Sequence, residues 1–501
     1  MEQPTEAALG GVNVGPPSEL SPESLSTLDE YAANPRFIQL QEELRGVLFA
    51  GASSYDASRQ TTPDGAAGAE GDTSAAVEAG NDDLPTDFAA SDLFSRVRIP
   101  KGRLIQYMHN WVSECAPYLD KFDHEKHFGI RVPIVSETSP ALFYALLAFS
   151  ARQMERKHGW TKNHDSLELY QESIRLLAPG MQAKDANMLV TACILAVLEL
   201  MSGSSRNWRR HIEGCATLFD LFKVNGFSGG GLLQGVFWCY ARMEVCGAII
   251  SSGTQSTVLP LHKWRPDDVS EDDAAAIFCR RGRENPDMHA NWAVYLCASA
   301  CDLLCRRTRF LELREQQHLF DRRSFVEQWR RLWRDLQYWY ETRPACMMPI
   351  EEEEVYKDAE KQQRQATTTT TTSTFPSIFF AHWPAISCHQ VYHATCIIAL
   401  EMRPKSEAVP SSSSSSPHGS LVWHARRVCG ISMTNPHKAS LINAIQPLYL
   451  AGRLLTHASE HVQVARLFKI IEQATGWGAL WRLRDLEAIW GYQPGEIAAS
   501  I

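Results

Sequence analysis

Long apolar runs with helical spacing constrain the fold of this chain more than any other feature. Between residues 94 and 343, nearly every run repeats its apolar side chains three and four residues apart and exceeds strand length. Alternating strand patterns bounded by Asn-Gly or Asp-Gly turns are missing. We therefore expect an all-α, irregular multi-helix domain. Helices are predicted at 141–154, 166–177, 185–201, 208–224, 232–251, 290–307, 323–342 and 385–402, and from 438 to about 490.

Polar, low-complexity stretches set the predicted domain boundaries. Residues 1–97 read as an acidic, mostly disordered leader, with a short helix at 35–49 that Asn34 would cap. Residues 98–495 form the helical domain, and two polar inserts interrupt it at 351–374 and 405–420. Because apolar helices on both sides of the first insert need each other for burial, we expect one folded unit.

The charge of the chain is uneven. Residues 1–95 hold 17 acidic and three basic side chains, a balance of −14, whereas the whole chain carries −9, so the remainder sums to about +5. A general nucleic-acid binder would show a basic face. An acidic leader on a nearly neutral body therefore argues against that class.

Cysteine usage and hydropathy favour a soluble intracellular protein. The 13 cysteines are an odd number, never occur as Cys-x-x-Cys, and fall mostly in apolar helical runs. Thiols of that kind act as small apolar side chains in a reducing compartment. A signal segment is missing at the N-terminus, and the long apolar stretch at 232–251 contains Arg242 and Glu244. We expect no membrane partner.

Three acidic side chains are the best argument for an enzyme. Asp267, Asp268 and Glu271 have the spacing by which all-α isoprenoid enzymes hold magnesium and pyrophosphate. The second metal motif that such enzymes need is not found. The competing interpretation, which we favour, is that residues 266–268 start a helix whose first turn accommodates acids. The isoprenoid-type enzyme remains the alternative.

Other arrangements of ligand-type side chains are weaker. His389 and His393 share a helix face, as do His457 and His461, but the metalloprotease glutamate is missing. Cysteines at 297, 301 and 305 lack the short spacing of zinc knuckles and suit a packing seam. We therefore expect no metal and no cofactor in this chain, and no catalytic residues.

The segment 81–95 interleaves acidic and apolar side chains. Such alternation is the compositional form of a transcriptional activation segment, because the acids keep the apolar groups solvated until a coactivator accepts them. The other interpretation is a linker whose last aromatic residue docks on the body. The residues concerned are Asp83, Leu84, Asp87, Phe88, Asp92 and Phe94.

The most specific pattern runs from 205 to 264, and a related one ends the chain. Its residues are Trp208, His211 and Gly214 with Cys215, then Phe237, Trp238, Tyr240 and Arg242, then Thr254 and Trp264, and later Gly476, Trp477 and Trp490. In order and spacing they resemble the regulatory domain of fungal zinc-cluster transcription factors. Cys215 stands where that family usually has alanine. Together with weaker blocks, the resemblance covers most of residues 34–492.

One departure from the family concerns its DNA-reading module. That module packs six cysteines, as two zinc thiolate sites, into about thirty residues. The first cysteine of this chain is Cys115, and no such cluster follows. We expect zinc and DNA contact only through an upstream module that is not present, unless the protein works without it.

The resemblance implies a nuclear protein that regulates transcription by RNA polymerase II as the effector domain of a zinc-cluster-type factor. Such a domain integrates effector, coregulator or dimerisation signals, and some are specific for one pathway or gene cluster. The expected partners are transcriptional coregulators and a second copy of the chain. A protein that only titrates partners stays open as a further alternative.

Overall fold

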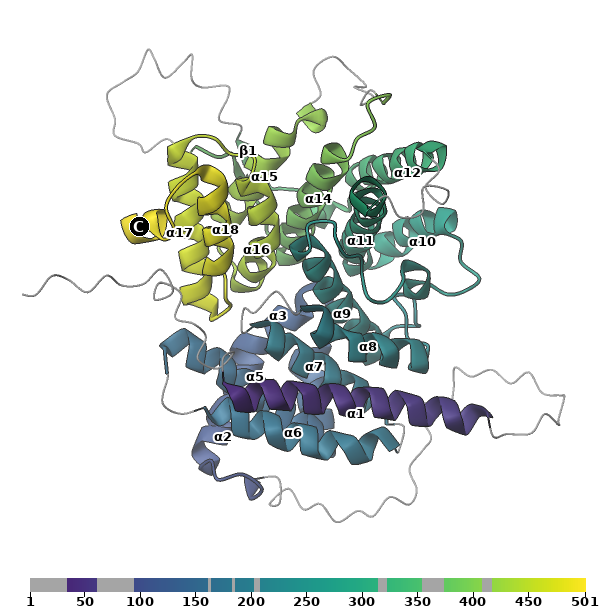
Figure 1. Cartoon of the computed structure of the whole chain (residues 1–501), viewed down its shortest axis with the longest axis vertical. Coiled ribbons are helices and arrows are strands. Elements are labelled where there is room, and N and C mark those ends of the chain that lie inside the picture. The colour runs from purple at the N-terminus through teal and green to yellow at the C-terminus, as the bar shows by residue number, and fades with distance from the viewer. Residues whose placement is uncertain are drawn as a thin grey trace, which may run out of the picture.

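The computed structural model of the chain is almost entirely helical in the residues it describes, which confirms the all-α prediction (Figure 1). The structure describes residues 34–60, 94–160, 164–182, 185–201, 208–313, 322–353, 374–407 and 417–501. Most of the predicted leader, including residues 83–92 of the activation segment, lies outside these ranges.

The helices of the first half include every one predicted there. They are α1 (Pro35–Gln60), α2 (Lys101–Asn110), α3 (Ala116–Leu119), α4 (Val132–Ser136), α5 (Pro140–His158), α6 (Asp165–Gln182), α7 (Asn187–Met201), α8 (Trp208–Phe222) and α9 (Gly231–Ile250). Short π and 3-10 turns lie between them at η3 (Trp111–Cys115), η4 (Asp120–Phe122), η5 (His127–Arg131) and η7 (Leu261–Trp264).

The second half adds one long helix that the sequence did not single out, α15, and contains α10, which was predicted only through a start at residues 266–268. Its helices are α10 (Glu271–Glu284), α11 (Pro286–Leu313), α12 (Arg322–Glu341), α14 (Trp383–Glu401), α15 (Leu421–Thr434), α16 (Lys438–Gly452), α17 (Ala458–Thr475), α18 (Leu480–Trp490) and α19 (Glu496–Ser500). The 3-10 turns η8 (Ala345–Met347) and η10 (Pro417–Gly419) precede β1 and α15.

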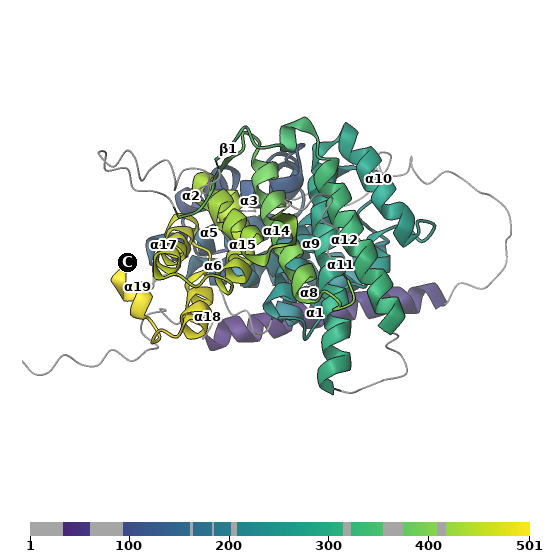
Figure 2. The same ribbon diagram turned by 90° about the horizontal axis from the view of Figure 1, so that it is seen from above.

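The helices pack in a continuous sequence from one end of the molecule to the other. Helix α5 packs on α6 and α7, α9 packs on α7, α8 and α11, and α11 packs on α14. Seen from above, α14 and α9 lie centrally, with α15 and α17 on one side and α10, α11 and α12 on the other (Figure 2). Helices of the two halves are therefore in direct contact.

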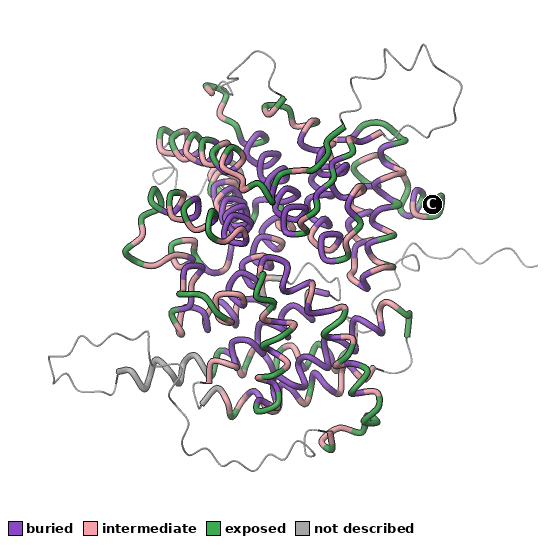
Figure 3. Tube along the Cα trace, turned by 180° about the vertical axis from the view of Figure 1, so that it is seen from behind, coloured by how far each residue is buried: buried purple, intermediate pink, exposed green. Residues whose placement is uncertain are grey.

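Buried residues concentrate on the inward-facing parts of the helices (Figure 3), and their apolar side chains form two clusters. The larger cluster draws on helices from α1 to α14 and includes Ile431 of α15 and Leu450 of α16, whereas the smaller one draws on α15 to α19 with Ile397 of α14. Trp477 and Leu421 are partly buried and pack against both clusters. A seam between the two clusters thus runs beside the C-terminal loop.

Helix α1 differs from the predicted short helix of the leader. It continues to Gln60 instead of ending near residue 49, and it packs along α6 and α8. Its apolar face is buried, with Leu40 fully inaccessible and Leu48 at 3% exposure. Gly214 of α8 lies so close that a Cβ there would be 2.5 Å from Leu48 Cδ1. This helix therefore belongs to the folded body.

The start of α10 corrects the prediction that residues 266–268 begin a helix. Ser270 is the N-cap, and its hydroxyl accepts a hydrogen bond from the Asp273 amide at 3.1 Å. The helix begins at Glu271, and its first-turn acids match the helix dipole. Asp267 and Asp268 precede the helix and are exposed. The helix therefore starts after the Ser270 cap and not at Pro266.

The predicted insert at 351–374 opens with a short strand. Strands β1 (Glu351–Glu353) and β2 (Ser377–Phe379) pair antiparallel, with Glu352 opposite Ile378. Glu352 forms a salt bridge with the buried Arg427 of α15. The second predicted insert also begins in described structure, because Glu407 pairs with Arg330 of α12 at 2.7 Å.

Candidate ligand pocket beside the family motif

The aromatic residues of the motif form a packed core. Phe237 and Trp264 are fully buried, and Trp238 is 3% exposed. The rings of Trp238 and Phe237 meet edge to face at 5.4 Å, and Trp264 lies 5.8 Å from Phe237. The Trp238 indole donates to the Gly226 carbonyl at 3.1 Å. These side chains are structural, because aromatic pairs of this geometry stabilise a core.

A buried carboxylate next to this core holds the loop that follows α9. Glu244 accepts backbone hydrogen bonds from Val258 at 2.7 Å and Leu259 at 2.8 Å, and it accepts one from the Tyr240 hydroxyl. Burial raises the pKa of Glu244 to about 7. Tyr240 and Glu244 are four residues apart on α9, so their side chains lie on the same helix face, and that face meets this loop. The loop then ends at Trp264.

Other motif positions are less central. Trp208 and His211 lie on α8, and their side chains fall outside the described part of the structure. Thr254 is exposed, and its hydroxyl donates to the Ser251 carbonyl in a turn at 2.8 Å. The buried threonine of this loop is Thr257, whose hydroxyl donates to the Leu259 carbonyl.

The C-terminal motif residues dock the end of the chain on the first half. Gly476 has a left-handed φ of 77°, and a Cβ there would lie 2.9 Å from the Gln153 carbonyl of α5. The Gln153 side chain in turn donates to the Thr475 carbonyl at 3.1 Å. Trp490 stacks on His461 at 4.1 Å and donates to the Gly452 carbonyl.

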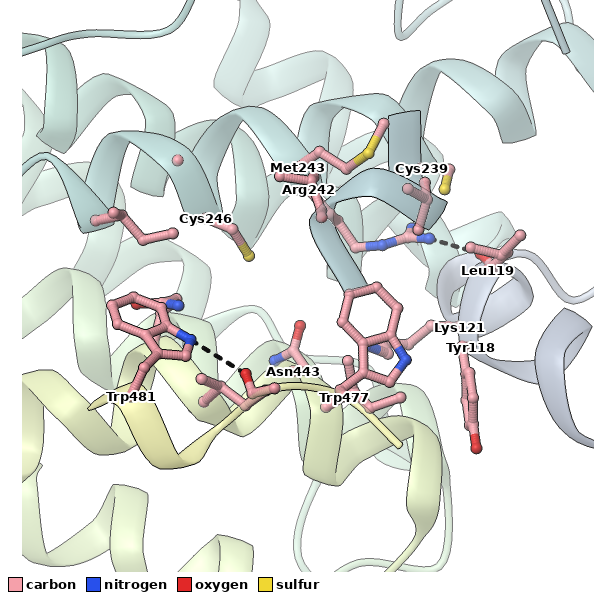
Figure 4. Close-up of a pocket in the computed structure, with 18 residues that line it drawn as sticks. Tyr118, Leu119, Lys121, Cys239, Arg242, Met243, Cys246, Asn443, Trp477 and Trp481 are labelled. Carbon is pink, nitrogen blue, oxygen red and sulfur yellow. Dashed lines mark hydrogen bonds between the residues drawn. The ribbon is translucent and has the colours of Figure 1, made fainter. Parts of the chain in front are cut away.

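A pocket of about 130 Å³ opens where these two regions meet (Figure 4). Helices α7 and α9 form one wall, α16, the loop at Trp477 and Gly478 and the start of α18 form the other, and the α3–η4 segment closes one end. The lining residues that matter here are Tyr118, Lys121, Val197, Leu200, Cys239, Arg242, Met243, Cys246, Ile250, Ile442, Asn443, Ile445, Gln446, Trp477 and Trp481. The pocket thus lies on the seam between the two core clusters.

The closed end of the pocket is positively charged. Lys121 is 7% exposed, and Arg242 of the motif lies near it and donates to the Leu119 carbonyl. Burial, aided by Arg242, lowers the pKa of Lys121 to about 7. A hydrogen bond with Cys193 lowers the pKa of the Cys239 thiol to about 7, and Arg242 and Lys121 act in the same direction. The pocket lining contains no carboxylate.

The comparisons with known proteins identify the family of the chain. Residues 106–496 match the fungal specific transcription factor domain. The chain belongs to this family. This confirms the resemblance inferred from the sequence, and it makes the protein a transcription regulator by family.

One relative supports the same conclusion. The transcription activator AMTR1 of Alternaria alternata is 23% identical over 500 residues, which cover 76% of this chain and 62% of that protein. The chain therefore matches less than two thirds of its relative's length. No solved structure matches the chain significantly.

The residues that argued for an enzyme do not come together in this family member. Asp267 and Glu271 line two different small cavities, and neither shares a helix face with Asp268. Glu271 instead pairs with Arg331 of α12 at 3.3 Å. The predicted common face for a divalent cation is not formed. The family to which the chain belongs is one of transcription regulators.

Three of the four paired histidines are buried in the packing, whereas His457 is exposed. His389 Nε2 lies 3.0 Å from the Met347 carbonyl, and His393 Nδ1 lies 2.8 Å from His424 Nδ1. His457 caps α17, and His461 stacks on Trp490. Within the described residues, no three side chains of metal-ligand type gather, and no helix is long and apolar enough to cross a bilayer.

Of the predicted activation segment, only its last aromatic residue is described. The Phe94 ring meets Phe143 of α5 edge to face at 5.7 Å, and the Lys101 ammonium lies 5.0 Å from its centre. Phe94 is half-buried against the larger core cluster. This end of the segment is therefore docked on the body.

Sequence reasoning missed the residues that make the pocket. Lys121 lies in a charged segment, and only its seclusion beside Arg242 distinguishes it. Arg242 and Trp477 were identified as family motif residues, but nothing in the spacing showed that they share a cavity. The one available signal was Arg242 itself, a charge inside the apolar run at 232–251.

Proposed function

We propose that this protein regulates transcription by RNA polymerase II in the nucleus, as the effector domain of a zinc-cluster-type factor for one pathway or gene cluster. It acts as an activator, recruits transcriptional coregulators and forms a homodimer. DNA is read by a six-cysteine module outside this chain. The proposal includes no catalytic step.

The observation that carries the proposal is the family match over residues 106–496, together with a relative that is itself named a transcription activator. The acidic character of residues 1–95 supports activation, since acidic and apolar side chains alternate within it. The mixed charges of the body support a protein that reaches DNA through another module, because base readout needs an element held in a groove by several cations.

A reporter assay tests the proposal. The 501-residue chain is fused to a foreign DNA-binding domain, and transcription from its operator is compared with that of the unfused DNA-binding domain. We expect several-fold higher output from the fusion. Output equal to that of the DNA-binding domain alone, from a fusion present at the same level in the nucleus, would overturn the proposal.

A second reporter measurement tests the activation segment. Residues 81–95 alone, fused to the same DNA-binding domain, should raise transcription, and the pair Phe88→Ala and Phe94→Ala should abolish the effect. The aromatic rings supply the area that a coactivator groove would bury. Thr86→Ala is the matched control and should leave the output unchanged. Equal output from the double variant would rule the segment out.

A further inference from the structure

The pocket on the seam between the two core clusters has the features of a binding site for a particular class of small molecule. We propose that it binds a small organic anion with one ring-sized apolar body and a single carboxylate. This inference extends the proposed function by naming the effector class, but the binding itself can be tested without transcription.

The size of the pocket sets the size of the ligand. Its volume of about 130 Å³ is close to that of an apolar protein cavity of about 150 Å³ that accepts benzene. A single aromatic ring, or a branched chain of similar bulk, therefore fills it. A nucleotide or a peptide helix would not fit.

The walls are suited to a ring. Side chains of α7, α9 and α16 present aliphatic surface, chiefly Val197, Met243 and Ile445. Trp477 in the loop after α17 and Trp481 in the first turn of α18 contribute two indoles, and the Trp481 indole donates a hydrogen bond to the Gly478 carbonyl at 3.2 Å. Apolar and aromatic walls with a few polar groups are typical of small-molecule sites.

Three hydrogen-bond donors gather at the opposite end from Trp481 (Figure 4). They are the Lys121 ammonium, the Arg242 guanidinium and the indole N–H of Trp477. The Trp477 nitrogen is buried and has no hydrogen-bond partner among the described residues. An unpartnered buried donor is unfavourable, and a carboxylate oxygen at this end would satisfy it.

The two cations that line the pocket have no carboxylate partner among the described residues. Within the described chain neither Lys121 nor Arg242 is part of a salt bridge, and no carboxylate lines the cavity. A third cation, Arg482, lies behind the wall; it is paired with Asp485 at 3.0 Å, its Nε donates to Gln446 Oε1 at 2.9 Å, and only its Nη2 is buried without a partner. Buried charge is costly unless it is paired, so this end attracts an anion.

The titration of Lys121 gives the site a measurable signature. Its titratable neighbours are Arg242, Cys239 and Cys246 on α9, and His437 at the start of α16. In the empty pocket the pKa of Lys121 is about 7, so the amine is mostly neutral at pH 8. A bound carboxylate favours the ammonium form and raises that pKa. Binding at pH 8 should therefore take up a proton, whereas binding at pH 6 should not.

Calorimetric titration of the purified 501-residue chain tests the class of ligand. The probes are benzoate and phenylacetate, with benzamide and benzylamine as neutral and cationic analogues of the same ring. We expect the carboxylates to bind at least about tenfold more tightly than benzamide, and benzylamine not to bind. Equal binding of benzoate and benzamide, or no binding of either carboxylate up to about 10 mM, would overturn the proposal.

Variants locate the site. Lys121→Met keeps the length of the side chain and removes the charge, and Trp477→Phe keeps the ring and removes the donor. Each should weaken carboxylate binding by about tenfold, since each removes a hydrogen bond to a charged group. Lys405→Met, at an exposed position outside the pocket, is the matched control. Carboxylate affinity unchanged in Lys121→Met would show that the anion binds elsewhere.

Proton uptake gives a readout that a loss of folding would not imitate. At pH 8 the binding heat should depend on the ionisation enthalpy of the buffer, and this dependence should be smaller in Lys121→Met, where only the Cys239 thiol can still take up a proton. Heat independent of the buffer in the wild-type chain would contradict the role of Lys121. Should the reporter fusion regulate transcription while no carboxylate binds, the ligand inference fails and the proposed function stands. Carboxylate binding without reporter output would mean that the ligand inference stands and the proposed function fails.

Discussion

Glu244 links the motif helix to the loop behind it through two backbone hydrogen bonds. Its carboxylate is inaccessible to solvent, and its position at i+4 from Tyr240 makes both side chains act on one loop. Single buried groups of this kind fix irregular segments, because a backbone N–H that loses its partner inside the protein costs about 1–3 kcal/mol. The motif pattern at the residue scale is therefore mainly a folding requirement.

Trp238→Ala should lower the free energy of unfolding by about 3–5 kcal/mol, because a buried aromatic ring is replaced by a cavity. The indole also loses its hydrogen bond to the Gly226 carbonyl. Chemical denaturation followed by circular dichroism measures the change. Trp160→Ala, at a position 42% exposed, is the control and should have a small effect. Nearly equal effects would show that Trp238 is not part of the core.

Because His289 is buried, we expect its contribution to the free energy of unfolding to fall as the pH is lowered. Burial lowers its pKa to about 3, so the unfolded chain, with a pKa of about 6.5, binds one more proton as the pH falls below 6.5. Its contribution to stability is therefore complete above pH 6.5 and is lost towards pH 3. At pH 5 the loss is about 2 kcal/mol relative to pH 7.5.

The comparison of His289→Phe with the wild type isolates this effect. Glu155 and Glu244, whose pKa values burial raises to about 7, change stability with pH in the opposite direction in both proteins. The phenylalanine ring retains the stacking position on Trp339. The variant should gain about 2 kcal/mol on the wild type between pH 7.5 and pH 5. An identical pH dependence of the two unfolding free energies would contradict the assignment.

At the scale of elements, the position of α1 depends on Gly214 of α8, which has no side chain. Gly214 allows α1 and α8 to approach, and an added Cβ would be 2.5 Å from Leu48 Cδ1. Small residues permit such close contacts between helices, whereas larger ones force the helices apart. This explains why a helix that the sequence assigned to the leader is part of the folded body.

Gly214→Ala should loosen α1 and increase amide hydrogen exchange across residues 35–60, with a cost of about 1–3 kcal/mol. Adding Leu48→Ala makes room for the new methyl group and should recover part of this loss. Gly46→Ala on α1 is the control, because a Cβ there meets nothing within 4 Å. Unchanged exchange in Gly214→Ala would mean that the contact does not hold α1.

At the scale of the whole molecule, α14 joins the two core clusters. Its residues Cys388 and Ile398 belong to the larger cluster, whereas Ile397 belongs to the smaller one. Helix α11, which precedes the 354–373 segment, packs directly on α14, which follows it. The apolar faces on both sides of the 354–373 segment therefore need each other for burial.

Cleavage at a protease site introduced into residues 367–372 should leave the two pieces associated, because their shared core is not interrupted. Size-exclusion chromatography after cleavage should give one peak containing both fragments. Residues 375–501 produced alone are the control and should be insoluble or unfolded. Two separate peaks of soluble, helical fragments would show that the halves fold independently.

The sequence by itself determined the helical class, the position of most helices and the family, because each depends on side chains three and four residues apart or on short motifs. Phe237, Trp238 and Trp264 could be placed in the core for the same reason. Helix α10 was placed too early, at residues 266–268, because the Ser270 cap was not weighed against Pro266. A sequence shows both possible helix starts, Pro266 and Ser270, but it does not show which of them the helix uses.

Only the tertiary structure decided where α1 lies and that a pocket exists. Lys121, Arg242 and Trp477 come from three segments spread over more than three hundred residues, and no periodicity connects them. Their charge and hydrogen-bonding state depends on burial, which arises when helices from distant parts of the chain pack together. A helix is a local structure that neighbouring residues specify, whereas this site forms on a seam between two clusters and exists only in the folded chain.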